Sequence, residues 1–122
     1  MALILIVDDE YFLAKMLADI LEDEGYEVEM ASNGKVALKA ARDKKPALII
    51  TDFMMPAMTG LELAEAVRAD RGISDTPIIL VSGAQGAIAR KRPELFHAVF
   101  DKPYSNYDML DEISKAIKSK EL

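Results

Sequence analysis

The sequence predicts an α/β fold in which a parallel β-sheet carries helices on both faces. Short and almost purely aliphatic segments recur at residues 3–7, 47–51 and 78–81, which is typical of strands buried on both faces of a sheet. Segments with helical periodicity separate them, so that strand and helix alternate through five rounds. Because parallel crossovers are right-handed and each covers one side of the sheet, this alternation predicts helices on both faces.

The remaining elements follow from local patterns. Two weaker strands are expected near the sheet edges, at residues 27–30 and 98–100. Asn33 and Gly34 should open a second helix that ends before Pro46, with a face of small residues, namely Val36, Ala37, Ala40 and Ala41. The first helix should end at Gly25 and bury one apolar stripe, made of Leu13, Met16, Leu17, Ile20 and Leu21.

Capping patterns mark two further helix starts. Thr59 with Glu62 and Ser105 with Asp108 have the spacing of a capping box before the third and fifth helices. The segment of residues 83–92 is less regular, because its glycines and the following Pro93 leave room only for a short helix.

Composition limits the class of protein. The 122 residues, 51% hydrophobic and 30% charged, suit one globular domain spanning residues 1–122. The absence of cysteine excludes disulfides and thiolate sites and suits the cytoplasm. A net charge of −6 opposes direct binding to nucleic acid. The apolar run at residues 2–7 is too short for a membrane span and lacks a basic leader, so we expect no membrane association and no export.

Polar side chains of interest all follow predicted strands. Asp8 and Asp9 come after the first strand, Asp52 after the third, Ser82 after the fourth and Lys102 after the fifth. Ligands of doubly wound sheets bind outside the carboxyl ends of the strands. In a flavodoxin-like strand order, 2-1-3-4-5, the first and third strands are neighbours, and the three carboxylates should share one crevice.

Three neighbouring carboxylates need a positive partner. Two like charges about 4 Å apart repel by roughly 4 kcal/mol at an effective dielectric of about 20. Mg²⁺ prefers oxygen ligands of this kind and commonly keeps positions for water or phosphate, while Lys102 would supply a second positive charge. Aspartate can accept a phosphoryl group, and such transfer depends on positioning and charge neutralisation. The pattern therefore predicts a Mg²⁺ site at which an aspartate could accept a phosphoryl group.

The sequence resembles the receiver domains of two-component response regulators over its whole length. Four motifs occur in the family's order, and these are Asp8-Asp9, then Asp52 with Met55-Pro56, Met58 and Gly60, then Ser82, then Lys102-Pro103. Each motif is weak alone, but their order and their positions at strand ends make the combination specific.

The resemblance implies a role for each matched residue. Asp52 would be the phosphoacceptor, Asp8, Asp9 and the Met54 backbone carbonyl would join it in binding Mg²⁺, and Ser82 and Lys102 would bind phosphoryl oxygens. The Lys102-Pro103 bond is expected to be cis. The phosphoryl donor would be a sensor histidine kinase or a histidine phosphotransfer protein, and the output would be binding to an unknown downstream protein. Such a protein is a signalling phosphoacceptor that assists its own phosphorylation and slow dephosphorylation, and not an enzyme in the ordinary sense.

Two departures from the family bear on the activation switch. Val99 stands where relatives commonly carry Tyr or Phe, three residues before the lysine; Phe96 or Phe100 are candidate replacements, although Phe100 should point to the opposite face from Val99. The chain between Ser82 and Lys102 is also shorter than is common.

Simpler interpretations remain for single residues. An acidic pair after a strand can merely cap a helix, and a lone Ser82 or Lys102 could be an ordinary surface or turn residue. We expect His97 to be structural. The basic run of residues 90–92 favours a solvated helix end over a partner contact. Loop packing, rather than a soft-metal site, is expected for three methionines, which are Met54, Met55 and Met58.

The same residues bear on alternative functions. A chain that ends after the fifth helix would act alone by binding another protein, but a receiver fragment of a larger response regulator or hybrid kinase would look the same. An aspartate-nucleophile phosphatase of the dehalogenase type needs a second Asp two residues after the first, where this chain has Glu10. A flavodoxin needs a phosphate-binding loop after the first strand, where Asp8 and Asp9 would repel phosphate.

Overall fold

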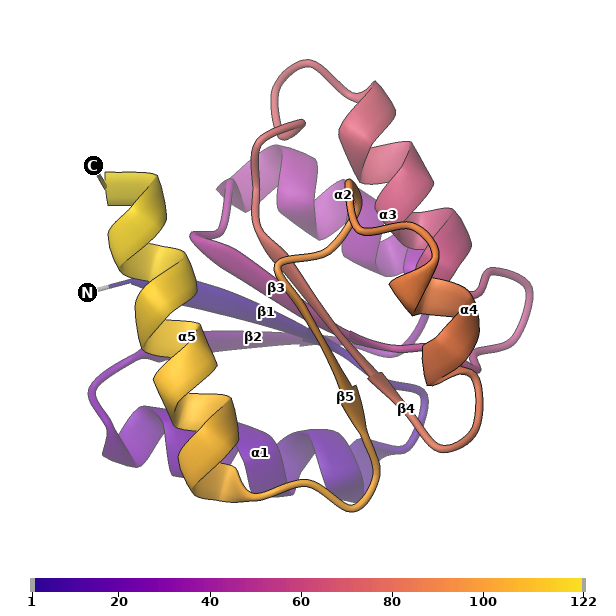
Figure 1. The fold of residues 1–122 in the computed structure, drawn as a ribbon. Helices are drawn as coiled ribbons and strands as arrows, with labels where there is room; N and C mark the ends of the chain where they lie inside the picture. Colours follow the sequence, from indigo (N-terminus) through magenta and orange to yellow (C-terminus); the bar gives the residue numbers. More distant parts are fainter. Residues whose placement is uncertain (1, 122) are drawn as a thin grey trace.

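A five-stranded parallel sheet forms the centre of the molecule (Figure 1). The structure, a computed structural model, describes residues 2–121. The strand order β2-β1-β3-β4-β5 confirms the predicted flavodoxin-like topology. The strands are β1 (Leu3–Val7), β2 (Glu27–Ala31), β3 (Leu48–Asp52), β4 (Ile78–Ser82) and β5 (Ala98–Asp101).

Helices cover both faces of the sheet, as predicted (Figure 1). The helices are α1 (Tyr11–Asp23), α2 (Gly34–Lys44), α3 (Gly60–Ala69), α4 (Gly86–Arg90) and α5 (Asn106–Glu121). Alternation along β1 divides the core, because Ile4 and Ile6 pack toward α1 and α5 whereas Leu5 and Val7 pack toward α2 and α3. A smaller cluster joins Ala89 of α4 to the sheet.

Helix α1 packs through only part of the predicted stripe. Leu13 and Met16 are 42% and 63% exposed, so their assignment to the buried face was wrong. The buried residues are Ala14, Leu17, Ala18 and Leu21. Leu17 and Leu21 belong to the predicted stripe, whereas Ala14 and Ala18 were not part of it. Val36 of α2 is likewise exposed, while Ala37 and Ala41 of the predicted small face are buried.

The predicted helix ends are largely confirmed. Asn33 caps α2 by accepting a hydrogen bond from the Val36 amide, and Gly25 adopts a positive φ of 93° after α1. Both hydrogen bonds of the Thr59–Glu62 capping box are formed at the start of α3. Ser105 accepts a hydrogen bond from the Asp108 amide before α5, and α4 is only five residues long.

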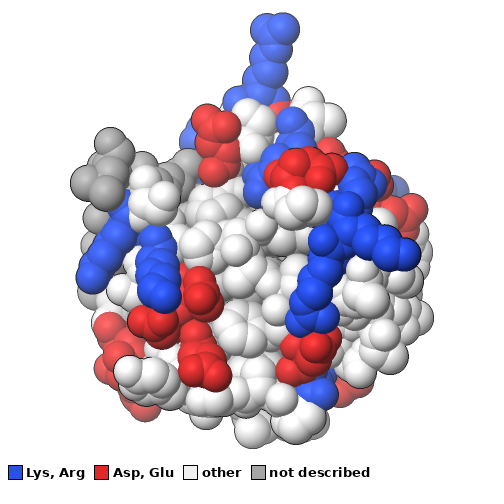
Figure 2. Space-filling view, viewed as in Figure 1, with Lys and Arg blue, Asp and Glu red and all other residues white. Residues whose placement is uncertain are grey.

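The surface over β5 lies between α4 and α5 (Figure 1). Charged side chains lie along both flanks of this face, over α4 and α5, with an uncharged band between them (Figure 2). None of the helices in residues 2–121 combines the length and hydrophobicity that a membrane span requires.

Candidate functional site

Three aspartates converge at the carboxyl edge of the sheet. Parallel pairing of β1 with β3 sets Val7 opposite Thr51, so that the residues after these two strands lie side by side. One carboxylate oxygen from each of Asp8, Asp9 and Asp52 lies within 4.8 Å of the others. Asp9 is exposed, whereas Asp8 and Asp52 are half-buried. The predicted clustering of the carboxylates is therefore confirmed.

The environment of Asp8 opposes its negative charge. Burial raises the pKa of the Asp8 carboxyl, and the charges of Asp52 and Asp9 raise it further, against the opposing effects of the Glu10 amide and Lys102. The Glu10 amide donates to the Asp8 carboxylate at 2.9 Å, which fixes its orientation. The cluster thus gathers more negative charge than its own hydrogen bonds neutralise.

Lys102 provides a positive charge at Asp52. Its Nζ lies 3.1 Å from the Asp52 Oδ1, and its backbone N–H donates to the Ser82 carbonyl, which fixes the start of the loop after β5. Burial lowers the pKa of the Lys102 ammonium, but the hydrogen bond and charge of Asp52, with Asp8 and Glu10, outweigh it and leave the pKa raised. Lys102 is accordingly held in its charged form. The Lys102-Pro103 peptide bond is cis, as expected.

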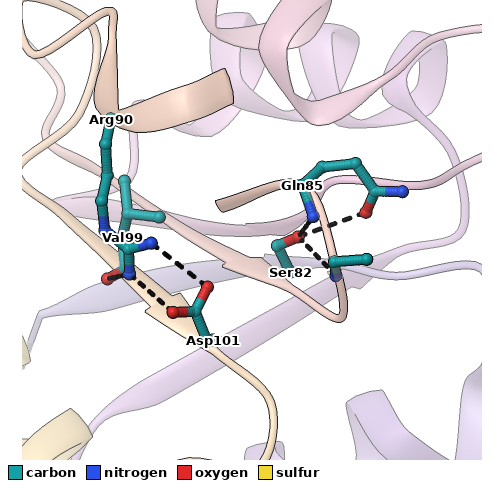
Figure 3. Close-up of polar contacts among 6 residues, drawn as sticks. Ser82, Gln85, Arg90, Val99 and Asp101 are labelled. Carbon is teal, nitrogen blue, oxygen red and sulfur yellow. Dashed lines mark hydrogen bonds and ion pairs between the residues drawn. The ribbon is translucent and has the colours of Figure 1, made fainter. Parts of the chain in front are cut away.

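Ser82 is buried at the end of β4, and its hydroxyl faces its own loop (Figure 3). The hydroxyl accepts hydrogen bonds from the backbone amides of Ala84 and Gln85, at 3.2 and 2.6 Å, and donates to the Gln85 side-chain carbonyl at 3.2 Å. The two residues predicted to bind the phosphoryl group therefore differ, because Lys102 contacts Asp52 whereas the Ser82 hydroxyl is bonded within residues 82–85. Sequence reasoning did not identify Gln85.

A cavity of about 310 Å³ opens beside the carboxylates. Asp8, Asp52 and Lys102 line its polar end, and Met16 of α1 and Tyr104 line an apolar wall. This explains why Met16 is not packed into the core, since it borders the cavity. The space adjoins the Asp52 carboxylate and can admit a phosphoryl group together with water.

Two of the three loop methionines pack against the rest of the chain. Met55 is buried and Met58 packs over Gly34, as predicted, whereas Met54 is 59% exposed, so the predicted packing was wrong for Met54. His97 lies 3.0 Å from the Glu112 carboxylate of α5, consistent with a structural role.

Arg90, from the basic run of residues 90–92, contacts β5 next to Val99, the residue at the family's usual aromatic position. Arg90 of α4 pairs with the Asp101 carboxylate at 3.0 Å and donates to the Val99 carbonyl at 3.2 Å (Figure 3). Arg92 pairs with glutamates, so both arginines end in ion pairs within the chain. Val99 and Phe96 pack on the α4 side of the sheet, whereas Phe100 packs on the other side, as alternation predicted.

A family model described as the response regulator receiver domain matches residues 4–122. The chain belongs to this family. The fold brings the aspartates and the lysine that carried the resemblance to one edge of the sheet.

Individual relatives agree with this assignment. The phosphate regulon transcriptional regulatory protein PhoB of Pseudomonas aeruginosa is 36% identical over 94% of this chain and 51% of its own length. A CheY-like receiver domain protein from Methanospirillum hungatei superimposes with a TM-score of 0.91 at 29% identity, covering 99% of this chain and 97% of that one. The response regulator TrrA of Thermotoga maritima, solved in complex with Mg²⁺ and BeF, gives a TM-score of 0.82 at 33% identity, covering 96% and 99%. The chain spans no more than about half of the length of the curated relatives it matches.

Gly60 allows the start of α3 to approach the end of β3 closely. Its amide donates to the Phe53 carbonyl, and a Cβ at this position would collide with the Asp52 carbonyl. We predict that Gly60→Ala lowers the free energy of unfolding of the receiver domain by about 1–3 kcal/mol, because backbone must move to admit the methyl group. Urea unfolding, monitored by circular dichroism, measures this change in the free energy of unfolding.

Gly83 supplies the matched control. It lies in the loop after β4, and a Cβ built there meets nothing within 4 Å. Gly83→Ala should change the free energy of unfolding by no more than about 0.5 kcal/mol. Equal unfolding midpoints for the two variants would contradict the steric argument.

Proposed function

We propose that this chain is the phospho-accepting module of a two-component or phosphorelay system, with Asp52 as the acceptor. The observation that carries the proposal is the position of the Asp52 carboxylate, which clusters with Asp8 and Asp9 and contacts the Lys102 ammonium. Receiver domains are signalling modules, and we propose that phosphorylation here regulates the binding of a downstream protein.

The donor set fits a magnesium ion. Asp8, Asp9 and Asp52 offer hard oxygen ligands, and their mutual repulsion favours a divalent cation over an empty cluster. We assign the Met54 backbone carbonyl as a fourth protein ligand, on the family resemblance. When bound, Mg²⁺ supplies positive charge to the phosphoryl oxygens. The complex of TrrA with Mg²⁺ and BeF supports the assignment by similarity.

The chemistry of the acceptor follows from the charges around it. A carboxylate oxygen of Asp52 attacks phosphorus, the bond between phosphorus and the donor atom breaks, and the leaving group takes the bonding electron pair. Lys102, already 3.1 Å from the Asp52 Oδ1, can then bind a phosphoryl oxygen, and Ser82 can donate its hydroxyl proton to another. The product is an acyl phosphate on Asp52.

A protein donor must reach Asp52 through the mouth of the site. The Asp52 side chain is only 13% exposed, and the adjacent start of α1 presents the exposed rings of Tyr11 and Phe12. We propose that the donor is a sensor histidine kinase or a histidine phosphotransfer protein, that the chain works in the cytoplasm, and that its net charge of −6 keeps it from contacting nucleic acid directly. To test the assignment of the donor, a radiolabelled phosphoryl group on a donor of either class can be traced as it transfers to Asp52.

The longer relatives leave two settings for the module. It can act alone by binding another protein, or as the receiver part of a longer response regulator or hybrid kinase, such as those whose length it only partly spans. The chemistry of Asp52 is the same in both settings. The sequence of the complete gene distinguishes them.

Phosphorylation of Asp52 can be tested with a small-molecule donor. Incubation with acetyl phosphate and Mg²⁺ should add one phosphoryl group per chain, detected by intact mass, because the acidic cluster positions the Asp52 carboxylate for attack. Asp52→Asn should remove the added mass while leaving the fold intact. Equal phosphorylation of this variant, or none of the wild type, would contradict the proposal.

We predict that the phosphoryl group is long-lived. In relatives, polar side chains two residues after the phosphoacceptor and two after the conserved hydroxyl residue can position the attacking water. Met54 and Ala84 occupy these positions here and cannot do so. The acyl phosphate of the Met54→Asn variant should therefore hydrolyse about threefold faster than that of the wild type, or more. Phosphate release from the purified phosphorylated protein measures this, and a wild-type half-life of only seconds would count against the prediction.

A further inference from the structure

The hydroxyl proton of Ser82 already has an acceptor in this structure. A serine hydroxyl has one proton to donate, and here it is donated to the Gln85 Oε1 at 3.2 Å. The backbone amides of Ala84 and Gln85 occupy its acceptor side, at 3.2 and 2.6 Å. Ser82 is buried, so solvent does not offer a replacement partner.

We infer that Gln85 is a positioning residue that holds the Ser82 hydroxyl away from the phosphoryl group until Asp52 is phosphorylated. The inference rests on the proposed function, and it states that the Gln85 side chain competes with a phosphoryl oxygen for the Ser82 proton. To donate its proton to a phosphoryl oxygen, Ser82 must give up the Gln85 side chain, because one proton serves one strong hydrogen bond at a time. Gln85 thereby reduces the affinity of the site for a phosphoryl group by the free energy of that bond.

The start of α4 is anchored independently of Ser82. Gly86 follows Gln85 directly, and a Cβ there would collide with the Asp101 carboxylate and with Arg90. Arg90 in turn binds the Asp101 carboxylate and the Val99 carbonyl, so it ties α4 to β5 (Figure 3). With the backbone at Gly86 held against β5, the Gln85 side chain is the part that can rotate. Breaking the hydrogen bond from Ser82 to the Gln85 Oε1 therefore requires a change of the Gln85 rotamer, while the contacts of Arg90 with β5 can stay in place.

The test compares binding of a phosphoryl mimic with binding of the metal alone. Gln85→Met keeps the length of the side chain but removes the acceptor oxygen, and Gln85→Ala provides a second variant without it. With Mg²⁺ saturating, both should bind beryllium fluoride about three- to tenfold more tightly than wild type, which is the range for one neutral hydrogen bond. Their dissociation constants for Mg²⁺ alone should equal the wild-type value. Isothermal titration calorimetry measures both constants.

A double-mutant cycle assigns the effect to Ser82. In the Ser82→Ala background, Gln85→Met should leave the affinity for beryllium fluoride unchanged, because no hydroxyl remains to be released. An unchanged affinity in Gln85→Met alone, an equal gain without the Ser82 hydroxyl, or a parallel change in Mg²⁺ affinity would each overturn the inference. If wild-type protein takes up Mg²⁺ but binds no beryllium fluoride, the proposed function itself fails, which is a distinct result.

Discussion

Electrostatic repulsion among three aspartates is the constraint on which the rest of this structure depends. Parallel strands bring their carboxyl ends to one edge, and the pairing of β1 with β3 places Asp52 beside Asp8 and Asp9. At about 4 Å, each pair of charges costs roughly 4 kcal/mol at an effective dielectric of about 20. The burial that raises the pKa of Asp8 adds to this cost. Lys102 supplies positive charge to this cluster, and on the proposed function a divalent cation would supply more.

The surrounding elements keep this cluster open and in place. Helix α1 packs closely through Ala14 and Ala18, and its larger Met16 borders the cavity beside the carboxylates. On the other side of Asp52, Gly60 lets α3 begin against the end of β3. Both features place small residues where a helix meets the sheet.

The serine and the lysine of the site are held in different ways. Lys102 is drawn to Asp52 by charge, which acts over several ångströms and needs no exact orientation. The Ser82 hydroxyl is bound by short-range hydrogen bonds that its own loop satisfies. On the proposed function, the two groups would meet a phosphoryl group at different cost, and for Ser82 that cost includes its hydrogen bond to Gln85.

Much of the fold and the site could be predicted from the sequence because both follow from periodicity. Strands buried on both faces leave unbroken aliphatic runs, and the strand-end rule places Asp8, Asp52 and Lys102 at one edge without coordinates. The stripe of α1 was predicted only in part, because large apolar residues were weighted over alanines. Leu17 and Leu21 are buried as expected, whereas Met16 borders a cavity.

Contacts made by long polar side chains were beyond such reasoning. Arg68 donates to the carbonyls of Ser74, Thr76 and Leu95 and fixes the segments that enter β4 and β5, yet no local pattern marks it. The same holds for Gln85 and for the pairing of Arg90 with Asp101. These contacts depend on rotamers and on residues distant in sequence.

Calorimetric titration of the unphosphorylated protein with Mg²⁺ tests the central claim most directly. The account predicts one ion bound per chain at about millimolar concentrations or below, and an affinity at least about tenfold weaker in Asp9→Asn, which removes one charged ligand while leaving Asp52 in place. No uptake at millimolar Mg²⁺, or equal affinity in Asp9→Asn, would contradict it.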